Sequence, residues 1–388
     1  MPPPPGSVQA AHELRRSLAE TTDTLGVLNR TAETLLARVP ADVWCGVVVD
    51  PATLLDTGGE HQHGFPAEVM PRLFEIEHAE QDDVDSLRSL VRRPAATSLL
   101  SASTGGSPES SRYYREILAP LRLADELRVL LREGGRTWGL LVMCRSRRSP
   151  GFTEQEVRVA ASLAVPATAA LRRSLLVGGI DNGQVADAPG VITVDDEHTV
   201  VTTSPTARRW LDELAETHPP GRLPHTVSAL VTHARTRPPG TVSTSRGRTR
   251  SGAWVTLHAW RDIGTAGKSG GTTISIGRSQ PGELVALILD AYALTPRERE
   301  VTQQVLLGRS TTEIATALHL STHTVQDHLK AIFDKTGVRS RRDLVADVFF
   351  RHYLPQLAGP SLTTDGRLRR RSTTPGSGVG PRTPGEPV

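Results

Sequence analysis

Two helix-start signals near the C-terminus constrain the fold of this chain most strongly. The stretches TPRE (residues 295–298) and STTE (residues 310–313) each place a capping hydroxyl three residues before a glutamate. Such capping boxes satisfy the backbone N–H groups that a helix start leaves unbonded, and Pro296 stands at the first helical position, where proline is favoured. The sequence therefore predicts two short helices that begin at these stretches.

A third helix follows a tight turn, with Ser321 or Thr322 as its N-cap. Apolar side chains recur at helical spacing and predict a buried face: Val325, Leu329, Ile332 and Phe333. The remaining faces carry mainly hydrogen-bonding side chains: Thr324, Gln326, Asp327 and Lys330. A fourth helix is expected over residues 341–353.

Two short helices joined by a tight turn and packed on a first helix form a helix-turn-helix, whose second helix lies in the major groove of DNA. Gln suits adenine, Lys suits guanine and Asp accepts from the cytosine amino group. Threonine hydroxyls and the free N–H groups of a helix N-terminus suit phosphates. The alternative is a small solvated helical bundle with no nucleic-acid partner.

The stretches LTPREREV, GRSTTEIATAL and LSTHTVQDHLKAIFDKTGVRSRRDL resemble the LuxR-type helix-turn-helix domain. The resemblance implies a bacterial-type regulator of transcription that binds double-stranded DNA as a homodimer through the fourth helix, with RNA polymerase as a candidate partner. It assigns base reading to Gln326, Asp327 and Lys330. It assigns phosphate contacts to Thr322, Thr324, Lys335, Arg339 and Arg341.

The same resemblance gives scaffold roles to Glu298, Val301, Ile314, Ala315, Val325 and Leu329. His319 stands where the family usually has a turn glycine, and histidine tolerates the positive φ that such a turn requires. Asp327 is unusual on a face that approaches DNA, because an acid weakens binding unless it meets a cytosine amino group.

Two further domains are expected upstream, which makes the fold class α+β: two α/β sensor-type domains followed by an all-α four-helix LuxR-type domain at residues 290–355. Residues 10–178 read as helix, strands, helices, hairpin and helix, and resemble a GAF-like sensor domain in DPATLLDTGG, SRYYREILAPLRLADELRVLLREGGRTWGLLVMCR and FTEQEV. Residues 185–280 resemble a PAS-like domain in GVITVDDEHTVVTTSPTARRWL. Either domain would bind a small molecule or only dimerise. Residues 1–9 and the basic tail 356–388 are expected to be disordered.

Enzymatic chemistry is not expected, because the sequence shows no GxxxxGK[ST] loop and no catalytic residues are proposed. No cofactor is expected, although an unidentified small-molecule ligand of the sensor domains is a candidate. His61 and His63 have a spacing that metal sites use. Since no third ligand is marked nearby, we expect a solvated loop and no metal site. Cys45 and Cys144 lie in apolar strands and are expected to be buried thiols; the alternative is a redox pair.

Charge and hydropathy indicate the kind of partner and the cellular location of the protein. Residues 294–388 hold 14 Lys/Arg and 9 Asp/Glu, whereas the whole chain has a net charge of only +3. The C-terminal end therefore favours an anionic partner. Without a signal peptide or a long apolar run, we expect a cytoplasmic protein with no membrane contact. Two other functions stay open: the promoter-reading region of a sigma factor, and a signalling or partner-binding protein with a degenerate DNA-binding domain.

Overall fold

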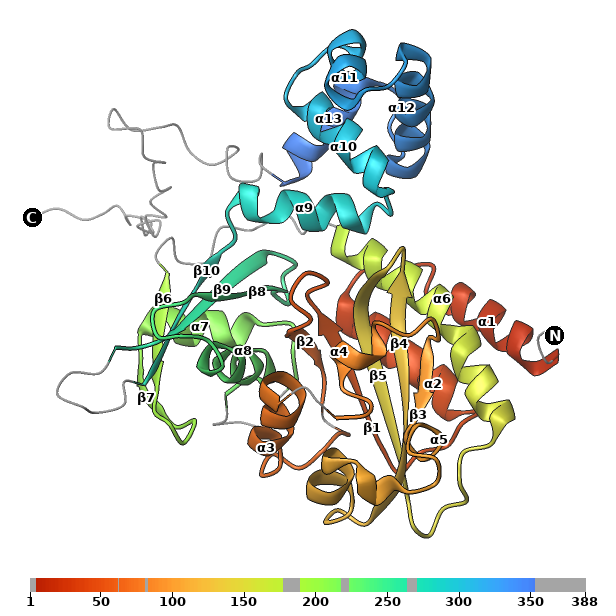
Figure 1. The fold of residues 1–388 in the computed structure, drawn as a ribbon, viewed down its shortest axis with the longest axis vertical. Coiled ribbons are helices and arrows are strands. Elements are labelled where there is room, and N and C mark those ends of the chain that lie inside the picture. The colour runs from red at the N-terminus through yellow and green to blue at the C-terminus, as the bar shows by residue number, and fades with distance from the viewer. Residues whose placement is uncertain are drawn as a thin grey trace, which may run out of the picture.

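The computed structural model describes residues 5–61, 63–80, 83–176, 189–217, 223–263 and 271–352. It contains two five-stranded antiparallel sheets followed by a group of C-terminal helices (Figure 1). The α+β class predicted from the sequence is confirmed. No helix in these ranges is long and apolar enough to cross a bilayer.

The first sheet has the strand order β2-β1-β5-β4-β3. Its strands are β1 (Val43–Val49), β2 (Asp56–Glu60), β3 (Thr97–Leu99), β4 (Leu123–Glu133) and β5 (Arg136–Ser146). The central strands β1, β4 and β5 are largely buried on both faces because helical layers cover each side. The predicted hairpin is confirmed: β4 and β5 pair around Gly134 and Gly135, which both adopt positive φ.

Three helices cover one face of this sheet: α1 (Pro5–Ser17), α2 (Thr24–Leu36) and α6 (Glu154–Leu176). Short helical segments belong to the rest of this domain: α3 (Met70–Phe74), η1 (Glu75–Glu80), α4 (Leu87–Leu90), α5 (Leu100–Ser103), η2 (Pro108–Ser110) and η3 (Tyr114–Leu118). Several of them pack against the opposite face through Ile76, Leu87 and Ile117. The acidic stretch after Pro66 thus forms three short segments, and η1 and η3 are π-helical turns.

The expected disorder of residues 1–9 is wrong for residues 5–9, which form the start of α1. The reason is tertiary: Ala10, Leu14 and Leu18 are buried against α6, and Ser162 Oγ donates to the Ser7 carbonyl at 3.2 Å. Residues 1–4 and the tail 356–388 lie outside the described residues. The helical pattern that follows is broken into α1 and α2, and Asp23 caps α2 by accepting from Gly26 N.

The second sheet has the order β7-β6-β10-β9-β8, which repeats the order of the first sheet when its strands are counted from β6. Its strands are β6 (Gly190–Val194), β7 (Val200–Thr203), β8 (Ser243–Arg248), β9 (Trp254–Arg261) and β10 (Thr272–Arg278). Helices α7 (Pro205–Glu213) and α8 (His225–Arg235) pack on it around the fully buried Trp210. No local sequence signal predicts α8.

The two sheets meet edge to edge, where β2 and β8 lie side by side (Figure 1). Residues 214–217 run between them. Gly59 N donates to the Ala215 carbonyl (3.2 Å), and Ala215 N donates to the Arg248 carbonyl (2.8 Å). Arg246 of β8 binds both carboxylate oxygens of Asp50 at 2.8 and 3.0 Å, and Asp50 is fully buried. The junction is therefore held by backbone pairing and a buried ion pair.

Helix α9 (Pro281–Ala291) connects the sheets to the C-terminal helices and packs on α6. Arg172 of α6 donates to the Ala291 carbonyl at 2.6 Å, and Asp290 binds both Arg136 and Arg299. Beyond α9 stand α10 (Pro296–Leu306), α11 (Thr311–Leu318), α12 (Thr322–Thr336) and α13 (Arg341–His352), away from both sheets (Figure 1). One continuous apolar cluster extends from α1, α2 and α6 through α9 into these helices.

Candidate functional site

The exposed face of α12 is the first candidate site. Ser321 caps the helix by accepting from Thr324 N, and Val325, Leu329 and Ile332 are buried against α10 and α11. Gln326, Asp327 and Lys330 are exposed on the opposite side. The three residues predicted to read bases therefore share one solvent-facing side of one helix. Its capped N-terminal turn also carries the exposed Thr322.

Local capping fixes the orientation of α12. Both capping boxes are present: Thr295 with Glu298 at α10, and Ser310 with Glu313 at α11. The turn between α11 and α12 is only three residues long and begins at His319, which adopts φ 52° and ψ 49°. This is the left-handed conformation that was expected at this turn, where histidine stands in place of the usual glycine. The helix-turn-helix geometry follows from these three local signals.

Three of the predicted phosphate contacts have partners inside the domain. Lys335 Nζ donates to Glu298 at 2.6 and 2.9 Å, which ties the end of α12 to the start of α10. The Arg341 guanidinium donates to the Arg309 carbonyl. Arg339 is exposed, and Thr324 shares a hydrogen bond with Ser321 (2.8 Å). Lys335 is thus part of the scaffold that holds α12, whatever it contacts outside the domain.

Asp327 has a partner that the sequence analysis missed. His323 Nδ1 lies 3.0 Å from Asp327 Oδ2, one helical turn earlier, and both side chains are exposed. The i, i+4 spacing is the signal that could have revealed this pair. The pair places an imidazole beside the acid on the face that is predicted to meet DNA.

Glu298 makes the stability of this domain depend on pH. Burial alone would raise the pKa of Glu298, but hydrogen bonds from the Lys335 ammonium and the Thr295 backbone amide lower it below its usual value. A lowered folded-state pKa stabilises the fold above the ordinary carboxyl pKa of 4.5, and this stabilisation disappears as the pH falls through the lowered value.

We therefore expect Glu298→Gln to destabilise the C-terminal helices at pH 7 by on the order of 1 kcal/mol, because charge-assisted hydrogen bonds are lost. The difference from the parent chain should shrink below pH 4.5. Hydrogen exchange of α10 and α12, corrected for the intrinsic pH dependence, measures both effects. Glu300→Gln is the matched control, since Glu300 is exposed on the same helix in a surface pair with Arg297. An equal effect in both variants would contradict the assignment.

A cavity of about 60 Å³ in the first domain is the second candidate site. Its lining combines apolar side chains with Asp56, Glu77, His78, Tyr113 and Arg128. Burial, with the nearby Glu216 and Glu77 carboxylates, raises the pKa of Asp56, and burial lowers the pKa of His78 to about 4. His78 is therefore neutral at pH 7.

A buried polar network borders this cavity. Arg128 Nε donates to Glu126 Oε1 (2.6 Å), Arg128 Nη1 donates to Glu77 Oε2 (3.1 Å), and the Tyr113 hydroxyl donates to Glu126 Oε2 (2.5 Å). Arg128 also lies over the Tyr113 ring, 5.1 Å from its centroid. The cavity thus offers both charged hydrogen-bonding groups and an apolar wall.

Both cysteines are buried free thiols, as the sequence predicts. Burial raises the pKa of Cys45 to about 12, and burial with the nearby Glu126 carboxylate raises that of Cys144 as well. Since the thiolate is the reactive form, these thiols are poor nucleophiles and poor redox partners at neutral pH.

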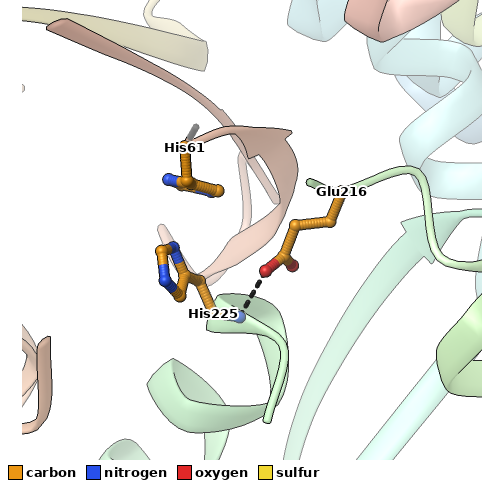
Figure 2. A group of neighbouring side chains, drawn as sticks. All are labelled: His61, Glu216 and His225. Carbon is orange, nitrogen blue, oxygen red and sulfur yellow. Dashed lines mark hydrogen bonds between the residues drawn. The ribbon is translucent and has the colours of Figure 1, made fainter. Parts of the chain in front are cut away.

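His61 and His63 lie in different surroundings. His63 is exposed and stacks on Trp44, away from any metal-ligand cluster of the described residues. His61 instead meets Glu216 and His225 of the second domain, and one ligand atom from each of the three lies within 4.8 Å of the others (Figure 2). No sequence signal pointed to this cluster, because His61 is more than 150 positions from Glu216 and His225 and belongs to the other domain.

Comparison with known proteins concerns mainly the C-terminal helices. Residues 292–347 match the family described as bacterial regulatory proteins, luxR family. Over 73 residues the chain is 38% identical to the probable HTH-type transcriptional regulator GfsR of Streptomyces halstedii, a match that spans 19% of this chain and 26% of that protein. Over 55 residues it is 38% identical to the spore germination protein GerE of Bacillus subtilis, spanning 14% of this chain and 74% of GerE.

Similar solved structures include the GAF domain/HD domain protein from Geobacter sulfurreducens, with 20% identity, a TM-score of 0.30, and coverage of 40% of this chain and 97% of that one. The VqmA–ligand–DNA complex of Vibrio cholera has 17% identity, a TM-score of 0.23, and coverage of 43% and 84%.

Proposed function

Because the chain belongs to the luxR family of bacterial regulatory proteins, we propose that it is a sequence-specific DNA-binding regulator of transcription. The observation that carries this proposal is the exposed polar face of α12. Gln326, Asp327 and Lys330 share a solvent-facing side, while the buried side fixes the helix on α10 and α11. A short helix presented in this way matches the shape of the major groove.

The roles of individual residues form part of the proposal. Gln326 and Lys330 read base edges, and Asp327 accepts from a cytosine amino group. Thr322, Thr324, Arg339 and Arg341 contact phosphates, which orient the domain without adding sequence information. Lys335 is assigned a phosphate contact in addition to its bond with Glu298.

Selection of binding sites from a random DNA pool with the full chain tests the proposal. On the selected site, Lys330→Ala and Gln326→Ala should each weaken binding by about 1–3 kcal/mol, roughly 5- to 150-fold, and relax preference at one base position. Arg339→Ala should weaken binding to all sequences alike. It should also make the salt dependence of binding shallower, by about the amount that one phosphate contact contributes.

Gln303→Ala is the matched control, because Gln303 is an exposed glutamine on α10 and lies outside the proposed reading face. It should leave both affinity and preference unchanged. If no sequence is enriched even at low salt, or if Gln303→Ala weakens binding as much as Gln326→Ala, α12 does not read bases. The chain would then be a partner-binding protein with a degenerate DNA-binding domain.

Control of this domain by the upstream domains is the second part of the proposal. The shared strand order of the two sheets supports GAF-like and PAS-like sensor domains, and the cavity beside Arg128 offers a place for a small polar ligand. A change in the first domain reaches the reading helices through α6 and α9, which the Arg172 bonds and the shared apolar cluster join.

A homodimer is the third part of the proposal. Two reading helices related by a two-fold axis would occupy half-sites about one helical turn of DNA apart, and α13 is the assigned contact between protomers. Light scattering of the free chain and of its complex with the selected site measures the stoichiometry. A single protomer in both samples would refute the dimer.

A further inference from the structure

We propose that His61, Glu216 and His225 form a binding site for a divalent transition-metal ion of the zinc class at the junction of the two upstream domains (Figure 2). This inference is independent of DNA binding. Imidazole nitrogens and a carboxylate oxygen are ligands that Zn²⁺ takes in proteins, and two histidines with one glutamate form a known type of three-ligand set.

The three ligands come from elements that the fold holds in register. His61 directly follows β2, Glu216 lies in the segment that pairs with β2, and His225 is the first residue of α8. Thr217 Oγ1 accepts from His61 N (3.0 Å) and donates to Glu60 Oε1 (2.7 Å). The backbone around the cluster is therefore bonded across the junction on both sides.

The imidazole of His61 has room because residue 59 is glycine. A Cβ at Gly59 would stand 2.9 Å from His61 Nε2 and 2.3 Å from the Gly46 carbonyl oxygen. Across the junction, the His61 and His225 rings have centroids 4.0 Å apart and meet at 66°. Figure 2 shows the two rings close together, with the Glu216 carboxylate beside them. The residue at position 59 thus permits the approach of the two imidazoles.

Hydrogen bonds orient the carboxylate of Glu216. It accepts from the backbone amide of His225, from Thr226 N (3.0 Å) and from the Thr226 hydroxyl (2.7 Å). Glu216 is completely buried and His225 nearly so. The Arg250 guanidinium donates to the backbone carbonyl of Glu216 and its charge acts on the carboxylate, and a bound cation would place a second positive charge at the carboxylate oxygens themselves.

The distances between the three ligand atoms are short enough for the side chains to close around one ion. The ligand atoms lie within 4.8 Å of one another, whereas tetrahedral coordination at 2.0–2.1 Å places them about 3.3 Å apart. Side-chain rotations of the two histidines can supply the difference, because their backbones and the carboxylate are already fixed. Three protein ligands leave one coordination position open. His61 and His225 both line the cavity described above.

Glu216 also has a purely structural role that the experiment must separate from metal binding. Pro224 occupies the N-cap position of α8, but its side chain cannot accept a hydrogen bond. Glu216 caps the helix instead, by accepting from the first backbone amides of α8. A helix cap requires only Glu216. A metal site requires all three side chains, and His61 belongs to a different domain.

The test is Zn²⁺ binding to the full chain in competition with a chromophoric chelator. We expect one Zn²⁺ per chain, and His61→Ala and Glu216→Gln should each weaken binding more than about 100-fold. The matched control is His63→Ala, two positions further along in the same loop, which should leave affinity unchanged. Bound Co²⁺ should give the visible spectrum of four-coordinate nitrogen and oxygen ligands in the parent chain and lose it in His61→Ala.

A thermal readout gives an independent check. Saturating Zn²⁺ should raise the unfolding midpoint seen by tryptophan fluorescence in the parent chain and in His63→Ala, but not in His61→Ala. Glu216→Gln keeps an oxygen for the cap, so it removes the carboxylate charge while the start of α8 stays capped. Zn²⁺ binding that survives His61→Ala, equal losses in His61→Ala and His63→Ala, or no stoichiometric binding by the folded parent chain would each overturn the proposal.

Discussion

Replacing Arg246 with methionine should lower the free energy of unfolding of the two upstream domains by about 3–5 kcal/mol. Arg246 holds both oxygens of Asp50, whose side chain is fully buried, and also donates to the Glu283 carbonyl at 2.8 Å. Removal of the guanidinium leaves the Asp50 carboxylate buried in the junction without its charged partner. The thermal midpoint should fall by on the order of 10 °C.

Tryptophan fluorescence measures this effect selectively, because all five tryptophans precede the C-terminal helices. Arg237→Met is the control, since Arg237 is exposed and its loss should change stability by less than about 0.5 kcal/mol. The double variant Asp50→Asn with Arg246→Met should recover part of the loss, because no charge is then left unpaired. A loss below about 1 kcal/mol in Arg246→Met would show that backbone pairing alone holds the junction.

Arg128→Met should destabilise the first domain by a comparable amount, about 3–5 kcal/mol or more. Arg128 is buried, donates to Glu126 and Glu77, and donates to the Asp85 carbonyl at 2.8 Å. The substitution leaves Glu126, which is 2% exposed, without its cationic partner. The added methionine side chain restores packing volume but supplies no hydrogen bond.

Tyr113→Phe provides the graded comparison for the same network. It removes one hydroxyl that donates to Glu126 and leaves the Arg128 contacts in place, so a cost of about 1–3 kcal/mol is expected. Denaturant unfolding of both variants, again followed by tryptophan fluorescence, measures how much stability each substitution removes. Equal costs would mean that the charge of Arg128 contributes little, and that the network is a set of ordinary hydrogen bonds.

Elements with local signals were predictable from the sequence. Some elements are determined by residues that lie close together in the sequence: the capping boxes at Thr295 and Ser310, the β4–β5 hairpin at Gly134 and the apolar run of β1. Helix α8 has no such local signal, because the group that caps it is Glu216, nine residues upstream. Strand β3 has only three residues and forms by pairing with β4. These elements depend on contacts that a single window of sequence does not contain.

The same distinction applies to the candidate sites. The placement of Gln326 and Lys330 on one exposed face follows from helical periodicity alone. The engagement of Lys335 with Glu298 depends on how α12 packs against α10, and the meeting of His61 with His225 depends on how two domains dock. Side-chain roles within one helix can be read from spacing, whereas roles that join two elements require the fold.

The edge-to-edge junction also protects the chain from association. The outer edge of a sheet presents unpaired N–H and C=O groups that recruit strands from other molecules. Here β2 and β8 face one another across residues 214–217, so each sheet conceals an edge that it would otherwise expose. A signal that drew the domains apart would open two such edges at once and invite aggregation. The route proposed above, through α6 and α9 with the junction closed, would avoid that hazard.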